Sequence, residues 1–177
     1  MKFIIESEKM KATKSNKFVW PDEIPMIVIT DYDRELCLTN LGIISIDGDK
    51  LGKRITRRSN YSEGIISKLI LLEDNHRIGI GEISFKLGEW DFSFEVGIKE
   101  YHELIIIYNI LTEIQRDQIE ERTILELVEK DSTAIEAYHT LMDKEADINE
   151  LIKMKLGKDY KFIFQKHLNS NMTNRIF

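Results

Sequence analysis

The spacing of apolar residues changes close to residue 99, and this change divides the chain into two halves. Before that point, a strand with one buried face is indicated by the alternating apolar residues Phe92, Phe94, Val96 and Ile98. Beyond it, a helix is indicated by apolar residues three or four positions apart, at Tyr101, Leu104, Ile105, Tyr108 and Leu111. The pattern therefore predicts a β-rich portion over residues 1–98 and an α-helical portion over residues 99–177.

Short apolar runs separated by turn residues predict a sheet in the first half. The β-branched run at 26–30 is typical of the inside of a sheet. Two further strands are expected at 36–38 and 42–46, and the sequence over 47–49 is typical of a tight turn that follows them. We expect these strands to form a strongly bent antiparallel sheet.

The segment 59–72 fits two structures. Ser62 is a suitable cap for a helical turn, whereas 68–72 is suitable for a strand. The strand is favoured, because the polar residues at 73–76 form a turn after it.

A change of phase interrupts the alternation between residues 77 and 85. The inward apolar residues are Ile78 and Ile80 at first, and Ile83 and Phe85 afterwards. One extra residue in a strand produces such a shift, so the pattern predicts a β-bulge near Gly81.

The second half contains no proline and a single glycine, so long helices are permitted. A first helix is expected to end at about Gln115, and a second to span 117–130. Ser132 is a cap for a third helix, and a fourth is expected over 147–157, where the glycine ends it. Alternating aromatic residues then predict a short final strand over 160–165.

Together these elements predict an α+β protein, with a bent antiparallel sheet followed by three or four helices and a short final strand. A chain of 177 residues is suited to one compact domain or two tightly packed subdomains. No apolar run approaches the roughly 20 residues that span a bilayer, so no membrane partner is expected. The first residues lack the features of an export signal, and we expect a cytoplasmic protein.

Cysteine content and charge limit the function further. Cys37 is the only cysteine, which excludes an internal disulfide, and its apolar neighbours predict a buried thiol rather than a nucleophile. The net charge of −6 is uneven, since residues 100–150 contain fourteen acidic and four basic residues. The plainer interpretation is a set of solvated helix faces, and the alternative is a surface complementary to a charged partner.

A basic stretch in the first half supplies the best candidate contact site. Its residues are Lys50, Lys53, Arg54, Arg57, Arg58 and Tyr61. The positive charges are suited to a nucleic-acid backbone, and the aromatic ring to stacking on a base. An acidic protein surface, including the helical half of another copy, is an equally suitable partner.

Other patterns for catalysis or metal binding are incomplete. Glu73 with His76, and Glu136 with His139, have the spacing of a dimetal site, but the first pair falls in an expected turn. The sequence has neither a glycine-flanked nucleophile nor a phosphate-binding loop. We therefore predict no catalytic residue, no cofactor-binding or metal-binding residue and no small-molecule substrate.

The leading hypothesis is a non-enzymatic component of protein–protein interaction or assembly, with a protein partner or self-association. The polar chain ends favour a bacteriophage or mobile-element structural protein, which would be virion-associated. The first alternative is a nucleic-acid-binding or nucleic-acid-mimicking regulator, such as an inhibitor of a host system. The second is a metal-dependent hydrolase built on Asp31, Asp33 and Glu35.

Overall fold

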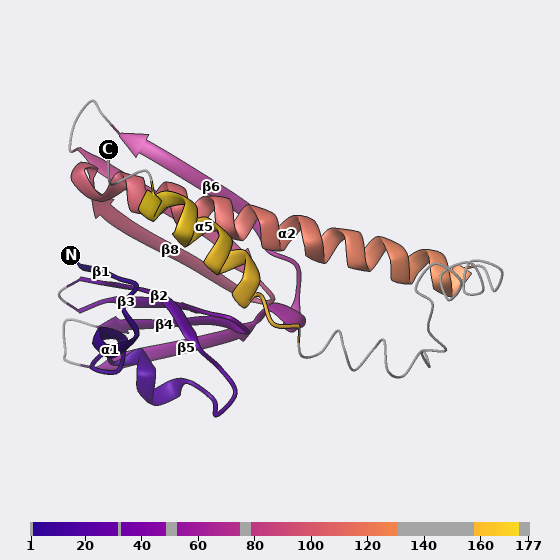
Figure 1. Cartoon of the computed structure of the whole chain (residues 1–177), viewed down its shortest axis with the longest axis horizontal. Coiled ribbons are helices and arrows are strands. Elements are labelled where there is room, and N and C mark those ends of the chain that lie inside the picture. The colour runs from indigo at the N-terminus through magenta and orange to yellow at the C-terminus, as the bar shows by residue number, and fades with distance from the viewer. Residues whose placement is uncertain (1, 32, 49–52, 75–78, 131–157, 174–177) are drawn as a thin grey trace.

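Two antiparallel sheets form the first half of the chain in the computed structural model (Figure 1). The structure describes residues 2–31, 33–48, 53–74, 79–130 and 158–173. The first sheet consists, in spatial order, of β1 (Lys2–Ile4), β2 (Pro25–Thr30), β3 (Glu35–Thr39), β4 (Gly42–Gly48) and β5 (Arg54–Asn60). The second consists of β6 (Ser67–Asp74), β7 (Ile80–Leu87) and β8 (Trp90–Gly97). Strands adjacent in space are consecutive in sequence, so both sheets are simple meanders. The α+β class is confirmed, but the single bent sheet expected in the first half is wrong, because its strands form two sheets.

Short helices occupy the connections between strands. Two of them, α1 (Ser7–Met10) and η1 (Ser15–Phe18), lie between β1 and β2. The turn η2 (Tyr61–Glu63) joins the two sheets, and η3 (Ile98–Glu100) leads out of β8.

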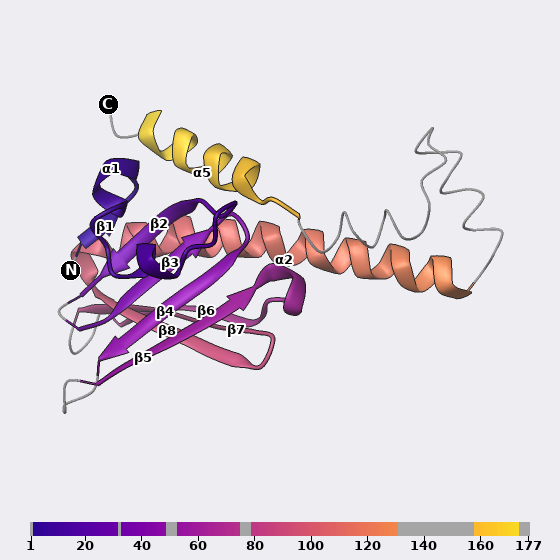
Figure 2. The same cartoon turned by 90° about the horizontal axis from the view of Figure 1, so that it is seen from below.

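The long helix α2 (Tyr101–Lys130) runs along the second sheet and extends beyond it (Figure 2). Its inward side chains recur at helical spacing and include Leu104, Ile107, Leu111 and Ile114. The helix α5 (Lys161–Thr173) lies beside α2 and adds Phe164 to the same hydrophobic core. One core thus contains residues from both halves of the chain. The division at residue 98 into two portions remains a prediction.

Strict alternation in β7 and β8 directs every second residue into this core. The inward residues are Gly81, Ile83, Phe85 and Leu87 in β7, and Phe92, Phe94 and Val96 in β8. Phe85 and Phe92 are paired across the two strands, with ring centroids 5.2 Å apart. The alternating pattern read from the sequence therefore corresponds to one buried face of the second sheet.

The final strand expected over 160–165 is wrong, because α5 begins at Lys161. Tyr160 and Phe164, four positions apart, are buried, whereas Phe162 between them is 74% exposed. The three aromatic residues alternate in the sequence, but burial of every fourth residue is the periodicity of a helix.

The expected end of a helix at about Gln115 is also wrong, since α2 continues to Lys130. Gln115 and Gln118 interrupt the apolar pattern because they hydrogen-bond the connection before β6. The third helix after Ser132 and the fourth over 147–157 lie outside the described residues. Among the helices that the structure describes, none has the length and apolarity needed to cross a membrane.

The strand favoured over 68–72 is confirmed by β6, but the bulge expected near Gly81 is wrong. The register instead shifts between Ser67 and Ile70, and Lys68 has a φ of 51°. Gly81 lies on the inward face of β7, in phase with Ile83 and Phe85, and a Cβ there would clash with the ring of Tyr101. The glycine therefore reflects close packing of η3 and α2 on the sheet rather than an extra residue.

Candidate functional site

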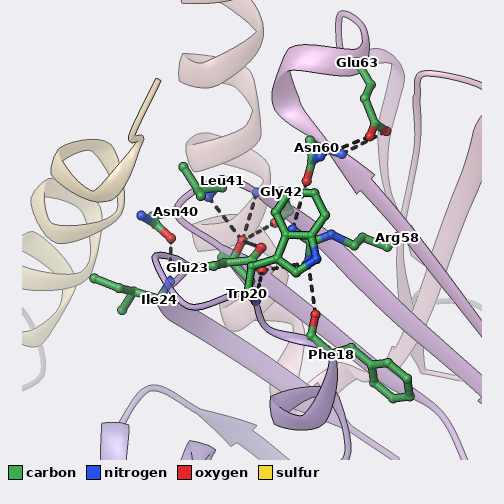
Figure 3. A network of polar contacts seen from close by, with 11 residues as sticks. Phe18, Trp20, Glu23, Ile24, Asn40, Leu41, Gly42, Arg58, Asn60 and Glu63 are labelled. Carbon is green, nitrogen blue, oxygen red and sulfur yellow. Dashed lines mark hydrogen bonds and ion pairs between the residues drawn. The ribbon is translucent and has the colours of Figure 1, made fainter. Parts of the chain in front are cut away.

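Two neighbouring arginines of β5, Arg57 and Arg58, point to opposite faces of the first sheet, because side chains alternate along a strand. Nη1 of Arg58 lies 2.7 Å from Oε2 of Glu23 and 3.3 Å from the carbonyl oxygen of Phe18. Its guanidinium carbon lies 3.8 Å from the centroid of the Trp20 ring (Figure 3). Arg58 thus holds the loop before β2 against β5.

The Glu23 carboxylate, which Arg58 neutralises, is completely buried. It also accepts hydrogen bonds from the Thr39 hydroxyl and, at 3.0 Å, from the backbone N–H of Trp20. The Thr39 oxygen in turn accepts the N–H of Gly42 at 2.9 Å. A charge can be buried at acceptable cost when a counter-ion and donors surround it in this way.

Asn40 connects three segments of the chain at the same end of the first sheet. Its Oδ1 accepts the backbone N–H of Ile24 at 2.6 Å, and its backbone carbonyl accepts the N–H of Tyr160 at 3.0 Å. The β3–β4 turn therefore holds the loop before β2 (Figure 3). It also holds the segment before α5.

A capping box between Asn60 and Glu63 closes the start of η2. The backbone N–H and the side-chain amide of Asn60 each donate to the Glu63 carboxylate at 3.1 Å, and the Ser59 hydroxyl donates at 2.9 Å. Nη2 of Arg58 donates to Oδ1 of Asn60 at 3.0 Å. All of these donors to Glu63 are uncharged, and among the described residues no cation forms an ion pair with it.

Trp20, Asn60 and Glu63 line a pocket of about 290 Å³ beside this network, which we name the Trp20 pocket. Its lining residues are Trp20, Leu41, Asn60, Tyr61, Ser62, Glu63, Gly64, Ile65, Gln118, Glu121, Arg122, Lys158 and Tyr160. The loop before β2, the β3–β4 turn, the η2 connection, α2 and the segment before α5 all contribute. The pocket therefore exists only when both halves of the chain are packed together.

Gln118 of α2 holds the floor of the pocket to the η2 connection. Its Oε1 accepts the N–H of Ile66 at 2.9 Å, and its Nε2 donates to the carbonyl oxygens of Tyr61 and Gly64 at 2.7 and 2.9 Å. One buried side chain thus satisfies three backbone groups that no strand partner reaches.

Lys158 and Tyr160 supply the wall that comes from the C-terminal segment. Lys158 forms ion pairs with Asp117 and Glu121 of α2. Burial lowers the pKa of Lys158, but the hydrogen bonds and negative charges of the two carboxylates raise it more, so its pKa lies above the ordinary value. The Tyr160 ring meets the Tyr61 ring edge to face, with centroids 5.2 Å apart.

The two tyrosines of the pocket are kept protonated by their surroundings. Burial, followed by the charges of Asp117 and Glu121, raises the pKa of Tyr160. Burial also raises the pKa of Tyr61, whose hydroxyl has no hydrogen-bond partner among the described residues. Neither phenol is therefore suited to act as a base near neutral pH, and the lining residues are suited to binding rather than to proton transfer.

The structure separates the predicted basic contact site into different environments. Arg57 pairs with Asp47 and lies 5.9 Å from the centroid of Trp90, on the face away from Arg58. Lys53 and Arg54 are exposed, and Lys50 lies outside the described residues.

Tyr61, which was expected to stack on a base, is 4% exposed and belongs to the core. Of the five predicted residues that the structure describes, Tyr61 lines the pocket and Arg58 lies over the ring of Trp20 beside it. A common role for all six as a contact surface remains a prediction.

Two candidates from the first sheet, the acidic Glu35 and the thiol of Cys37, are both buried. The carboxylate of Glu35 is buried and accepts the N–H groups of Lys14 and Ser15 at the start of η1. Cys37 is fully buried with Val28 and Ile44 on the sheet face opposite the main core. Burial raises the pKa of its thiol to about 12, which keeps the thiol unreactive near neutral pH.

Sequence reasoning missed most of the pocket, including Trp20. It also missed Glu23 and Thr39, which form the buried network beside the pocket. Nothing in their spacing relates them to Arg58, which follows Glu23 by 35 residues. A weak signal was available in Trp20, because an aromatic residue beside a proline turn in a polar loop is unusual unless it has a partner.

Comparison with known proteins identifies the fold. The structure is similar to the crystal structure of a PH-domain-containing bacterial protein from Exiguobacterium sibiricum 255-15, with a TM-score of 0.71 and 19% sequence identity. The similarity covers 93% of this chain and 97% of that chain. The two sheets and the helix that follows them are therefore a PH-like arrangement.

Two further comparisons are more distant or carry less detail. A DUF1696 family protein with a pleckstrin-homology domain from Shewanella loihica PV-4 has a TM-score of 0.47 and 12% identity, over 63% of this chain and 94% of that chain. The uncharacterized protein YvbH of Bacillus subtilis (strain 168) is 26% identical in an alignment 189 residues long, which covers 94% of this chain and 92% of YvbH. No family model matches the chain.

These similarities correct the expected function. The hypothesis of a bacteriophage or mobile-element assembly component is wrong, because a protein that shares the fold over nearly its whole length is a bacterial PH-domain-containing protein. The similar sequence is also that of a bacterial protein. The alternatives of a nucleic-acid regulator and a metal-dependent hydrolase gain no support from these relatives.

Proposed function

We propose that this chain is a binding module without catalytic activity, and that it holds a segment of another protein in the Trp20 pocket. A PH-like fold by itself does not decide between ligands, so the argument rests on the site. The observation that carries the proposal is an exposed tryptophan, fixed in place by a buried arginine–glutamate pair at the mouth of a pocket.

The composition of the pocket is that of a protein contact. Tryptophan, tyrosine and arginine supply most of the binding energy at protein interfaces, and Trp20, Tyr61, Tyr160 and Arg122 all line the pocket. Trp20 is 52% exposed, yet Arg58 covers its ring and Glu23 holds Arg58. Because the ring is already held, little conformational entropy is lost when a partner covers it.

The size of the pocket supports an inserted segment rather than a large free ligand. Pockets for small molecules usually have volumes of roughly 300–1,000 Å³, and this one lies at the lower limit. A volume of about 290 Å³ is enough for one or two side chains of a chain that continues across the surface. Apolar contact with Leu41 and Ile65 would accompany the aromatic contacts.

The ion pairs of the arginines in the first half argue against an anionic lipid headgroup as the ligand of Arg58 or of Arg34 and Arg57. Arg58 is paired with Glu23, and both Arg34 and Arg57 lie within ion-pair distance of Asp47. A phosphate group would have to compete with these carboxylates for each guanidinium, and the buried pair would be costly to break.

A selection with a displayed library of random dodecapeptides tests the proposal. We expect peptides that bind the wild-type chain, and we expect Trp20→Ala to weaken the best of them by at least about tenfold. Trp90→Ala is the matched control, because Trp90 is also exposed and also lies near an arginine. Peptides that bind equally well to the wild type and the Trp20→Ala variant would overturn the proposal.

A further inference from the structure

Each cation that lines the Trp20 pocket already has a carboxylate partner, whereas one of the lining carboxylates has no counter-ion among the described residues. The two cations are Lys158, which is shared between Asp117 and Glu121, and Arg122, which is 3.0 Å from Glu126. Glu63 adds a carboxylate whose hydrogen-bond donors are all neutral. The lining therefore contains two acidic and two basic residues, and Glu63 is the carboxylate without a counter-ion among the described residues. Arg58 and Glu23 neutralise each other beside it.

Aromatic side chains line the same pocket as the Glu63 carboxylate. Arg58 covers one face of Trp20, but about half of the residue remains exposed at the pocket. Within the same region, Lys158 Nζ lies 5.6 Å from the centroid of the Tyr160 ring, so the site already stabilises cations on aromatic rings. Aromatic surface in a pocket with a carboxylate that has no counter-ion favours a cation and disfavours an anion.

From these features we infer that the partner segment inserts an arginine or lysine side chain into the Trp20 pocket. The inference rests on the proposed function and names the chemistry of the ligand. The Glu63 carboxylate supplies the counter-charge, and Trp20 supplies the aromatic surface. A long basic side chain has an apolar stem for Leu41 and Ile65 as well as a charged end.

An acidic or phosphorylated segment is the opposite case and is disfavoured. Lys158 and Arg122 would have to leave their carboxylate partners to receive it. An added anion would also lie near Glu63 and Glu121, which line the same pocket. Like charges placed close together in this way weaken binding.

The test uses peptides selected on the full-length chain and remade by synthesis. In each peptide that requires Trp20, every arginine is replaced in turn by citrulline, which has nearly the same shape but no charge. We expect one such replacement to weaken binding to the wild type by about tenfold. We expect the same replacement to have little effect on binding to the Glu63→Gln variant, because that variant already lacks the counter-charge.

Two control variants separate charge from folding. Glutamine preserves a side-chain oxygen that accepts the backbone N–H of Asn60, so we expect Glu63→Gln to retain this capping hydrogen bond. An unchanged thermal unfolding curve would verify that the variant folds as the wild type does. Glu120→Gln removes the same charge from an exposed position of α2 that is paired with Arg116 outside the pocket. We expect Glu120→Gln to bind the peptides as the wild type does.

The outcomes distinguish the two proposals. A citrulline effect that disappears in Glu63→Gln supports the basic side chain. Peptides that require Trp20 but tolerate citrulline at every arginine, and that contain no required lysine, would overturn the inference and leave the proposed function intact. A selection that yields no Trp20-dependent peptide would overturn the proposed function itself.

Discussion

Arg57 and Arg58 are adjacent in sequence and have similar partners, yet their surroundings differ. Each pairs with one carboxylate and lies near one tryptophan, Arg58 with Glu23 and Trp20, and Arg57 with Asp47 and Trp90.

The two pairs differ in burial and in packing. The Glu23 side chain is 0% exposed and that of Asp47 is 30% exposed, and the ring distances are 3.8 and 5.9 Å. Strand alternation thus places one arginine in a buried network and the other at the surface.

This difference shows that two arginine–carboxylate pairs can contribute differently to stability, depending on their burial. A surface ion pair contributes little, because water screens both charges before and after folding. A buried pair must be complete, since either partner alone is a charge without solvent. We therefore expect Arg58 to determine the shape of the Trp20 pocket, whereas Arg57 adds only local packing at the edge between the sheets.

The largest expected effect is that of Arg58→Ala. It leaves the fully buried Glu23 carboxylate without its counter-ion, which costs about 3–5 kcal/mol in the free energy of unfolding. Urea denaturation followed by circular dichroism measures the loss. The double variant Glu23→Gln with Arg58→Met should recover part of it, and a double variant as unstable as Arg58→Ala would show that the charge is not responsible.

Thr39→Val should have the next largest effect. The change preserves volume but removes the hydroxyl that donates to Glu23 and accepts from Gly42. Leaving these buried groups without a partner costs about 1–3 kcal/mol. The same urea measurement applies, and an unchanged unfolding midpoint would show that the β3–β4 turn does not depend on this hydroxyl.

Arg57→Ala should change stability by no more than about 1 kcal/mol, because Asp47 and Arg57 are both partly exposed. Whatever effect it has should decrease at high salt, whereas that of Arg58→Ala should not. Paired unfolding curves at low and high salt make the comparison. Equal losses for the two arginines would contradict the distinction drawn from burial.

The contact between α2 and α5 should give a smaller, pH-dependent effect. The hydrogen bond from Lys166 lowers the pKa of Glu113, burial opposes this, and His167 lowers it further. A carboxyl group with a lowered pKa stabilises the fold above its unfolded pKa of about 4.3 and loses this contribution as pH falls through the folded value.

Stability should therefore decrease more steeply below about pH 4 in the wild type than in Glu113→Gln. Urea unfolding curves of both proteins across acidic pH measure the difference. Parallel pH profiles for the two proteins would show that this contact does not contribute.

The sequence predicts the strands well because burial of one sheet face imposes a period of two. Phe92, Phe94 and Val96 and their partners in β7 are examples. It predicts the helical segments less well, because Gln118 is polar by sequence but buried, and Gln115 is partly buried. Both hydrogen-bond a connection that is distant in the sequence. Tyr160 and Phe164 mislead for a related reason, since their alternation with an exposed Phe162 resembles a strand.

The pocket could not be predicted, because its residues come from segments that meet only in the folded chain. Arg58 was identified for its charge, but its partner Glu23 is 35 positions away and its tryptophan lies in a loop. Tyr61 was identified for its ring and proves to be part of the core. Which of several arginines is buried depends on strand register, and register is a tertiary property.

The most direct test of the proposed binding site is the fluorescence of Trp20. The chain contains two tryptophans, so Trp90→Phe leaves Trp20 as the only reporter. Titration with a selected peptide should shift its emission to shorter wavelength, because the partner covers a ring that is 52% exposed. The fluorescence titration should give the same Kd as calorimetry. Tight binding by calorimetry without any change in Trp20 emission would place the partner elsewhere and contradict the proposal.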